Sequence, residues 1–198
     1  ENNNQRSVAY GDGVYKSVDG GRSWKNMGLK NSEHIGNILV HPHNSDVVYV
    51  SAYGPLWNEG GDRGVYKTND GGKTWNRILH VDEHTGFNEI HMDPRNPDVL
   101  YAASHQRRRH VFTYVGGGPG SKIYKSTDGG ENWRELKGGL PSAIKGRIGM
   151  DISPADPDYL YALVEAEKDQ QGLYVSKDRG ESWNKTNKYV TSGNYYQE

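Results

Sequence analysis

The chain has 198 residues, a formal net charge of −1 and no cysteine. A near-neutral chain with mixed charges lacks the overall field that steers nucleic acid or an anionic membrane surface, so we predict neither as a partner. The absence of cysteine excludes disulfides and cysteine metal sites. No apolar stretch approaches the roughly 20 residues of a membrane-spanning helix, so we predict no membrane insertion.

The composition favours an all-β protein. The chain contains 14 tyrosines, 5 tryptophans and 26 glycines, and short β-branched or aromatic runs alternate with turn residues. The first residues, "ENNNQRS", have the composition of a loop. We therefore expect the chain to be an interior part of a longer, exported protein.

The first predicted hairpin, "GVYKSVDGGRSW" at 13–24, recurs as "GVYKTNDGGKTW" at 64–75, "KIYKSTDGGENW" at 122–133 and "GLYVSKDRGESW" at 172–183. All copies share the pattern Ser/Thr-x-Asp-x-Gly-x-x-Trp. The shared positions are Ser17, Asp19, Gly21 and Trp24; Thr68, Asp70, Gly72 and Trp75; Ser126, Asp128, Gly130 and Trp133; and Ser176, Asp178, Gly180 and Trp183. A period of about 50 to 60 residues is typical of repeat architectures.

A second landmark precedes each of the last three copies. A proline-led turn joins two apolar runs in "HPHNSDVVYVSA" (41–52), "DPRNPDVLYAAS" (93–104) and "SPADPDYLYALV" (153–164). Proline ends the first run because it cannot donate to a central ladder. Each unit therefore has four antiparallel strands, A to D from the axis outward, with the repeated hairpin forming C and D. We predict a β-propeller segment of four-stranded antiparallel blades.

The repeat also predicts the domain organisation. We place the outer part of a first blade at 1–33, blades at 34–85, 86–145 and 146–187, and the start of a further blade at 188–198. All belong to one larger propeller, because so few blades cannot close a ring and would leave apolar faces open at both ends. We expect the remaining blades to come from the same longer chain or from another copy.

The repeated pattern is similar to the Asp box of BNR-type repeats. Over nearly all of its length the chain resembles the sortilin-type and xyloglucanase-like propellers, including large bacterial proteins labelled glycosyl hydrolases. The resemblance implies an Asp-box turn between strands C and D of each blade. It leaves function open, because such propellers include hydrolases, receptors and assembly factors.

The box residues are predicted to hold the fold, because the same carboxylate recurs in every blade, which a single active site does not require. Its aspartate accepts backbone N–H groups across the turn, and its tryptophan covers the hairpin. The alternative is that these aspartates bind calcium or act as general acids. Arg179 replaces the middle glycine of the fourth copy, so we expect the last glycine to carry the demand for a positive φ.

Variation in length separates the two faces of the propeller. The turns between strands A and B are constant, whereas the connections between B and C vary. These inserts, at 1–13, 53–64, 104–121 and 165–172, share a face with the connections between D and the next A, at 80–86 and 137–146. Loops on a rigid scaffold are where binding usually resides, so we expect this loop face to carry the function.

Two inserts supply the candidate ligand contacts. The candidates are Trp57, Glu59, Asp62, Arg107, Arg108, Arg109 and Tyr114. Trp57 lies outside any box and is suited to stacking on a sugar, with the two acidic residues on hydroxyls; the alternative is packing against a neighbouring blade. The arginine run is suited to a carboxylate, sulfate or phosphate; the alternative is a solvated loop tip.

Two motifs are rejected on their context. The stretch "HVDEH" at 80–84 matches the H-x-x-E-H pattern of inverted zinc peptidases, but it joins two predicted strands where that chemistry needs a helix. The stretch "GGGPGSK" at 116–122 has the glycines of a phosphate loop, but a strand follows where a helix is required. We therefore predict no metal and no cofactor.

Two functions remain open. The first is a binding or scaffold propeller, outside the cell or in the bacterial periplasm or cell surface, that recognises a glycan or a protein through its loop face. The second, implied by the xyloglucanase-like resemblance, is a glycoside hydrolase, which needs two carboxylates about 5 to 9.5 Å apart. The acidic residues on the loop face are Glu59, Asp62, Asp82, Glu83, Glu165 and Glu167. None matches a catalytic motif, so the catalytic residues stay unassigned. A sialidase is disfavoured because no motif places the arginines and Tyr114 together at the axis.

Overall fold

The computed structural model describes residues 10–167 and 169–188. These residues form β-strands and one short 3-10 helix, η1 (Lys30–Ser32), which confirms the all-β prediction. Within this part of the chain, no helix is long and apolar enough to cross a membrane. The predicted start of a further blade at 188–198 lies outside the described residues, apart from its first position.

Three four-stranded antiparallel sheets make up most of the structure. The first contains β3 (Ile35–Val40), β4 (Val48–Ala52), β5 (Gly64–Thr68) and β6 (Asn76–Leu79). The second contains β7 (Thr85–Asp93), β8 (Asn96–Gln106), β11 (Ile123–Ser126) and β12 (Arg134–Leu136). The third contains β13 (Lys145–Ile152), β14 (Leu160–Ala166), β15 (Gly172–Ser176) and β16 (Asn184–Asn187). Two short hairpins pair β1 (Tyr15–Lys16) with β2 (Lys25–Asn26), and β9 (Arg108–Arg109) with β10 (Tyr114–Val115).

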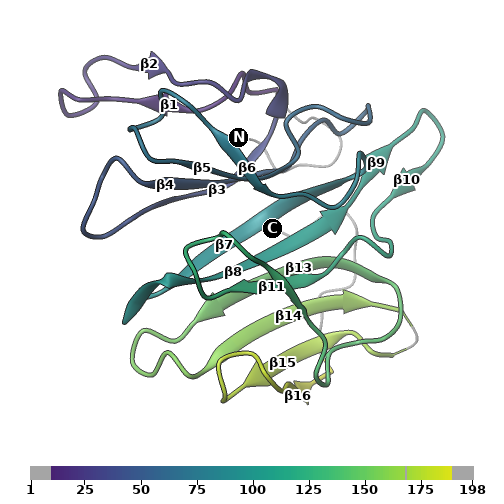
Figure 1. Cartoon of the computed structure of the whole chain (residues 1–198). Helices are drawn as coiled ribbons and strands as arrows, with labels where there is room; N and C mark the ends of the chain where they lie inside the picture. Colours follow the sequence, from purple (N-terminus) through teal and green to yellow (C-terminus); the bar gives the residue numbers. More distant parts are fainter. Residues whose placement is uncertain (1–9, 168, 189–198) are drawn as a thin grey trace.

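The sheets lie side by side, as Figure 1 shows. The first strand of each sheet faces its counterpart in the next, since β3 contacts β7 and β7 contacts β13. The runs on either side of each proline-led turn form the first two strands of a sheet, as predicted. One expectation needs correction. The stretch 104–121 is not all loop, because β8 continues to Gln106 and the β9–β10 hairpin follows it.

Strand β8 supplies side chains to two cores, because successive residues of a strand point to opposite faces. Leu100 and Ala102 pack with residues of the first sheet, while Tyr101 and Ala103 pack with residues of the third. On the other faces of the first and third sheets the cover is incomplete, although Ile38 and Val40 line a pocket together with Val14 and Met27. Side chains there are partly exposed: Ile38 and Val40 of β3 by 46% and 52%, and Tyr161 and Leu163 of β14 by 40% and 45%.

Each repeated turn is closed by its own side chains. In the second copy the Thr68 hydroxyl accepts the N–H of Gly72 at 2.9 Å. Asp70 accepts the N–H groups of Lys73 and Thr74, both at 2.9 Å, and the Thr74 hydroxyl at 2.6 Å. These bonds, that of the Thr74 hydroxyl foremost, hold the pKa of Asp70 well below its ordinary value. The hydroxyl-to-glycine bond recurs in the first, third and fourth copies at 2.8, 2.9 and 2.8 Å.

Two residues of each turn are left-handed, not only the last glycine. In the second copy Gly71 has φ 71° and Gly72 has φ 92°; in the fourth, Arg179 has φ 61° and Gly180 has φ 87°. A φ near 60° is open to other residues at moderate cost, which explains Arg179. In the third and fourth copies the last position needs glycine for space as well, because a Cβ on Gly130 would lie 2.6 Å from Ile78 and one on Gly180 2.8 Å from Leu136.

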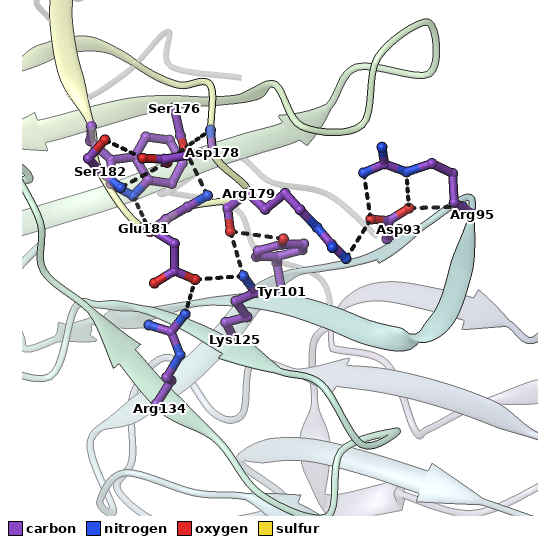
Figure 2. A network of polar contacts seen from close by, with 12 residues as sticks. Asp93, Arg95, Tyr101, Lys125, Arg134, Ser176, Asp178, Arg179, Glu181 and Ser182 are labelled. Carbon is purple, nitrogen blue, oxygen red and sulfur yellow. Dashed lines mark hydrogen bonds and ion pairs between the residues drawn. The ribbon is translucent and has the colours of Figure 1, made fainter.

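A polar network joins the second and third sheets (Figure 2). The Tyr101 hydroxyl and the Lys125 ammonium donate to the backbone carbonyl of Arg179 at 3.0 and 2.7 Å. The Arg179 guanidinium lies 3.3 Å from Asp93, which also binds Arg95 at 3.2 Å. Burial alone would raise the pKa of Asp93, but hydrogen bonds from Arg95 and the charges of both arginines lower it. Sequence-distant segments are thereby fixed to one another.

The same contact occurs one repeat earlier. The Tyr49 hydroxyl and the Lys67 ammonium donate to the carbonyl of Gly129 at 3.0 and 2.9 Å. Lys16 reaches the carbonyl of Gly71 at 3.4 Å. We call this arrangement the carbonyl joint: side chains of one sheet donate to the carbonyl of the first left-handed turn residue of the next.

Replacing Asp70 with alanine should lower the melting temperature, because two N–H groups and two hydroxyls of the turn lose their acceptor. The effect should repeat with Asp128→Ala, since Asp128 accepts the Ser126 hydroxyl and both the N–H and the side-chain amide of Asn132. Thermal unfolding followed by circular dichroism measures it. Ligand affinity should be unchanged in both variants, and a variant that kept its melting temperature but lost its ligand would contradict the structural role.

Candidate functional site

Inserted loops of two neighbouring sheets meet at one end of the molecule. The loop 53–64 connects β4 to β5, and the stretch 107–122 connects β8 to β11 and contains the β9–β10 hairpin. The N–H of Arg109 donates to the carbonyl of Leu56 at 2.9 Å, which ties the two loops together. Figure 1 shows β9 and β10 projecting beyond the end of the second sheet.

A buried arginine shapes the loop 53–64. Arg63 is only 1% exposed, and its guanidinium donates to the carbonyls of Tyr53 and Asn58, both at 2.9 Å, and to that of Pro55. Burial, followed by the charge of Arg107, lowers its pKa to about 10. The group therefore stays charged at neutral pH and is bound largely by neutral carbonyls.

A buried tyrosine and histidine lie beneath the loops. His105 is 3% exposed, and its Nε2 lies 3.0 Å from the carbonyl of Gly116. A carbonyl only accepts, so Nε2 carries the proton and Nδ1 accepts from the Tyr53 hydroxyl. Burial lowers the pKa of His105 to about 3 and raises that of Tyr53. The Arg107 guanidinium lies 3.4 Å from the centroid of the Tyr53 ring.

Above this pair lie the predicted ligand residues. The Arg109 guanidinium lies 6.0 Å from the Trp57 ring centroid and 5.3 Å from that of Tyr114. The Trp57 side chain is 40% exposed. Burial raises the pKa of Tyr114 to about 12. We call Tyr53, Trp57, Arg107, Arg109 and Tyr114 the arginine–aromatic cluster.

Of the remaining predicted residues, Arg108 and Glu59 lie beside this cluster and Asp62 does not. Glu59 pairs with Arg108 at 3.1 Å. Asp62 lies elsewhere in the loop and accepts the N–H of Asn31 at 2.9 Å. It therefore anchors the loop to η1, and the structure does not bring it to the arginines.

A small cleft adjoins the cluster through Gly116, whose neighbours include the Tyr114 ring. The cleft has a volume of about 270 Å³. Its walls come from the glycines at 116–117, the start of β13 and the end of β14, and they carry Glu165 and Glu167. Glu165 accepts the N–H of Arg147 at 3.1 Å. The cleft is therefore polar and lies on the loop face.

The two rejected motifs occupy loops, not helices. In the stretch 80–84, His80 lies 3.7 Å from Glu83, whereas His84 lies 4.0 Å from Glu59, so the histidines face different partners. Among the described residues, no group of three or more potential ligands is placed to hold a metal ion. The glycine stretch is bound to β13 through Gly118, whose N–H donates to Lys145 at 3.0 Å.

Comparison with known proteins shows the family. The model of the Sortilin-Vps10 family, described as "Sortilin, neurotensin receptor 3", matches residues 12–115 and 63–198. The chain belongs to the Sortilin-Vps10 family.

Curated relatives of this Sortilin-Vps10 chain include two kinds of protein. A xyloglucanase of Paenibacillus sp. is 25% identical over 191 residues, which cover 89% of the chain and 17% of the relative. The xyloglucanase Xgh74A of Acetivibrio thermocellus is 27% identical and covers 67% of the chain and 16% of its own length. The vacuolar protein sorting/targeting protein 10 of Eremothecium gossypii is 28% identical over an alignment that covers 82% of the chain and 11% of the relative. The chain thus spans about a sixth or less of these relatives.

Solved structures confirm the propeller fold of the Sortilin-Vps10 chain. The GH74 xyloglucanase from Xanthomonas campestris is 16% identical with a TM-score of 0.68, covering 90% of the chain and 27% of the enzyme. An ancestral GH74 enzyme is 20% identical with a TM-score of 0.67, covering 91% of the chain and 22% of the enzyme. The resemblance to sortilin-type and xyloglucanase-like propellers is confirmed.

Sequence reasoning about this Sortilin-Vps10 chain missed Tyr53, Arg63 and His105. One signal was present for His105: it follows Tyr101 and Ala103 at alternate positions of β8, which puts it on an inward face. Nothing in the sequence distinguishes Arg63 from an exposed loop arginine, because its burial depends on how the loop folds back over it.

Proposed function

We propose that this chain is a binding segment of the propeller of an exported bacterial protein, acting outside the cell or in the periplasm or cell surface. Its loop face binds a glycan at the arginine–aromatic cluster. One observation carries the proposal: inserts from two different sheets place a 40% exposed Trp57 beside Arg109 and Tyr114.

The chemistry of the cluster suits a sugar. An aromatic ring offers an apolar surface to the C–H face of a pyranose, while neighbouring charged groups hydrogen-bond its hydroxyls. The loops are prepared for this role before binding, because Arg63 binds three carbonyls of one loop and His105 binds the other. Preorganisation reduces the entropy lost on binding. Three relatives named xyloglucanase favour a polysaccharide.

A protein partner is the second candidate ligand, and it is favoured by a relative named as a protein sorting and targeting protein. Both candidates use the same loop face. A polysaccharide panel distinguishes them, since only a glycan-binding segment retains affinity for isolated polysaccharides.

Hydrolysis is the alternative activity, and the names of the relatives are the observation that favours it. Several loop-face carboxylates already have partners: Glu59 pairs with Arg108, Glu83 with His80, and Glu165 with a backbone N–H. Such contacts favour positioning over proton transfer. Incubation with plant and microbial polysaccharides, followed by an assay for reducing ends, tests this. Turnover that one carboxylate substitution abolishes would establish a hydrolase in place of the binding role.

Trp57→Ala should weaken binding to the best polysaccharide of the panel about tenfold, because the ring is the main exposed apolar surface of the cluster. Isothermal titration calorimetry measures the affinity. The matched control is Trp24→Ala, which removes a 62% exposed tryptophan from a repeated hairpin and should leave affinity unchanged. Equal losses in both variants, or no polysaccharide binding at all by the parent chain, would contradict the proposal.

A further inference from the structure

We propose that the glycan recognised by the cluster is acidic: a polysaccharide containing uronic acids, whose carboxylate binds Arg107 and Arg109 while its ring lies on Trp57. This inference rests on the proposed function and names the ligand class of the same site. It follows from the charge and the hydrogen-bonding state of the arginines.

The cluster contains two arginines and no carboxylate, although the charge of Glu165 acts on Tyr114 from nearby. Arg108 has an ion-pair partner, Glu59, at 3.1 Å. Arg107 and Arg109 form no ion pair with any of the described residues; the Nε atoms of all three arginines are buried without a hydrogen-bond acceptor. Arg63 binds neutral carbonyls. An anionic ligand would supply the carboxylate partner that Arg107 and Arg109 lack.

The stacking of the arginines leaves their donors available. Arg107 lies 3.4 Å from the centroid of the Tyr53 ring, which is the distance of face-to-face contact. A guanidinium stacked in this way keeps its N–H groups in its own plane, pointing past the edge of the ring. Arg109 is likewise close to the rings of Trp57 and Tyr114. The Tyr53 ring therefore orients the Arg107 guanidinium without using its hydrogen-bond donors.

Both arginines act on the same place. Burial is the main cause of the raised pKa of Tyr114, and the charges of Arg107 and Arg109 both lower it in part. The charge of Arg107 also contributes, after burial, to the lowered pKa of His105 and His34. The charge of Glu165 raises the pKa of Tyr114, so both arginines and this carboxylate act near its hydroxyl.

The surroundings favour a carboxylated sugar over other anions. A planar carboxylate fits the fork of a guanidinium with two parallel hydrogen bonds. The exposed face of Trp57, next to Arg109, accepts the ring to which the carboxylate of a uronic acid is attached. Glu59, exposed at the edge, is available to sugar hydroxyls. A sulfated glycan or an acidic peptide lacks one of these matches, and both are outcomes of the test.

The test uses a ligand pair that differs only in charge. The full chain is titrated by calorimetry with an oligogalacturonide and with its fully methyl-esterified form, and separately with a sulfated glycan and a polyglutamate peptide. We expect the acid to bind at least tenfold more tightly than the ester, with an affinity that falls as salt rises. Arg109→Gln should remove this preference, and Arg22→Gln, which changes an exposed arginine of the first repeated turn, should keep it.

Each outcome is decisive. Equal affinity for acid and ester would overturn the acidic-sugar inference, while binding of both that still depends on Trp57 would leave the proposed function intact. Tighter binding of the sulfated glycan or of the peptide would overturn the inference in favour of those ligands. Retention of the acid preference by Arg109→Gln, with an unchanged melting temperature, would also overturn it. If no glycan binds in either test, both the acidic-sugar inference and the proposed function fail.

Discussion

Replacing Arg63 with methionine should lower the free energy of unfolding by about 3 kcal/mol and remove ligand binding at the cluster. The guanidinium binds three backbone carbonyls of one loop, and the side chain is 1% exposed. Methionine fills much of the volume but donates nothing, so these carbonyls lose their partner. Gly54, at φ 78°, lies directly over the arginine stem, where a Cβ would come within 2.3 Å of it. The loop is therefore built around this side chain.

Urea unfolding gives the stability, and calorimetry with the best glycan gives the affinity. Arg22→Met is the matched control, because it makes the same change at an exposed position and should alter neither quantity. A stable Arg63→Met variant with full affinity would show that the loop folds without its central arginine.

Acidification from pH 6.5 to pH 5 should lower the stability by about 2 kcal/mol. Burial lowers the pKa of His105 from 6.5 to about 3. Below pH 6.5 the unfolded chain binds a proton at this position, and the native chain does not until about pH 3. Stability is therefore complete above pH 6.5 and is lost progressively as the pH falls. Buried His34, whose pKa is also lowered by burial, acts in the same direction.

Melting temperatures measured from pH 7.5 to pH 4.5 test this expectation. The His105→Gln variant has no titrating group at this position, so its profile should be flatter between pH 6.5 and pH 5 even if its baseline is lower. The box aspartates do not interfere in this window; the pKa of Asp178, lowered chiefly by the Ser182 hydroxyl, is about 2. Parallel profiles for the parent and the variant would show that His105 is not the acid-sensitive group.

The strands were predictable because their signals are local. The apolar run before the first proline-led turn forms β3, Ile35–Val40, which ends where that turn begins. The turn residues Thr68 and Asp70 likewise bond within five residues of themselves. The left-handed φ of Arg179 was harder to predict. A glycine at this position in the other copies is compatible with a positive φ but does not show that the turn requires one.

The site was predictable in its residues but not in its assembly. Trp57 and Arg109 stood out as unexplained by the repeat, yet their approach depends on how two sheets are placed against each other and on the bond between Arg109 and Leu56. Asp62, equally plausible by sequence, anchors its loop to Asn31. Contacts between distant segments of this kind are set by packing, which a single sequence does not specify.

The carbonyl joint bears on how a repeat protein lengthens by duplication of its units and how their sequences then change. Its acceptor is a backbone oxygen, and every residue has one, so the contact between units survives a change of side chain at the turn. Arg179 illustrates this: its carbonyl still receives Tyr101 and Lys125, while its side chain adds a bond to Asp93. A duplicated unit therefore carries both the donor side chains and the acceptor carbonyl needed to contact its neighbour. The sequence of the turn is then free to vary, and side chains can add further contacts while the carbonyl joint is kept.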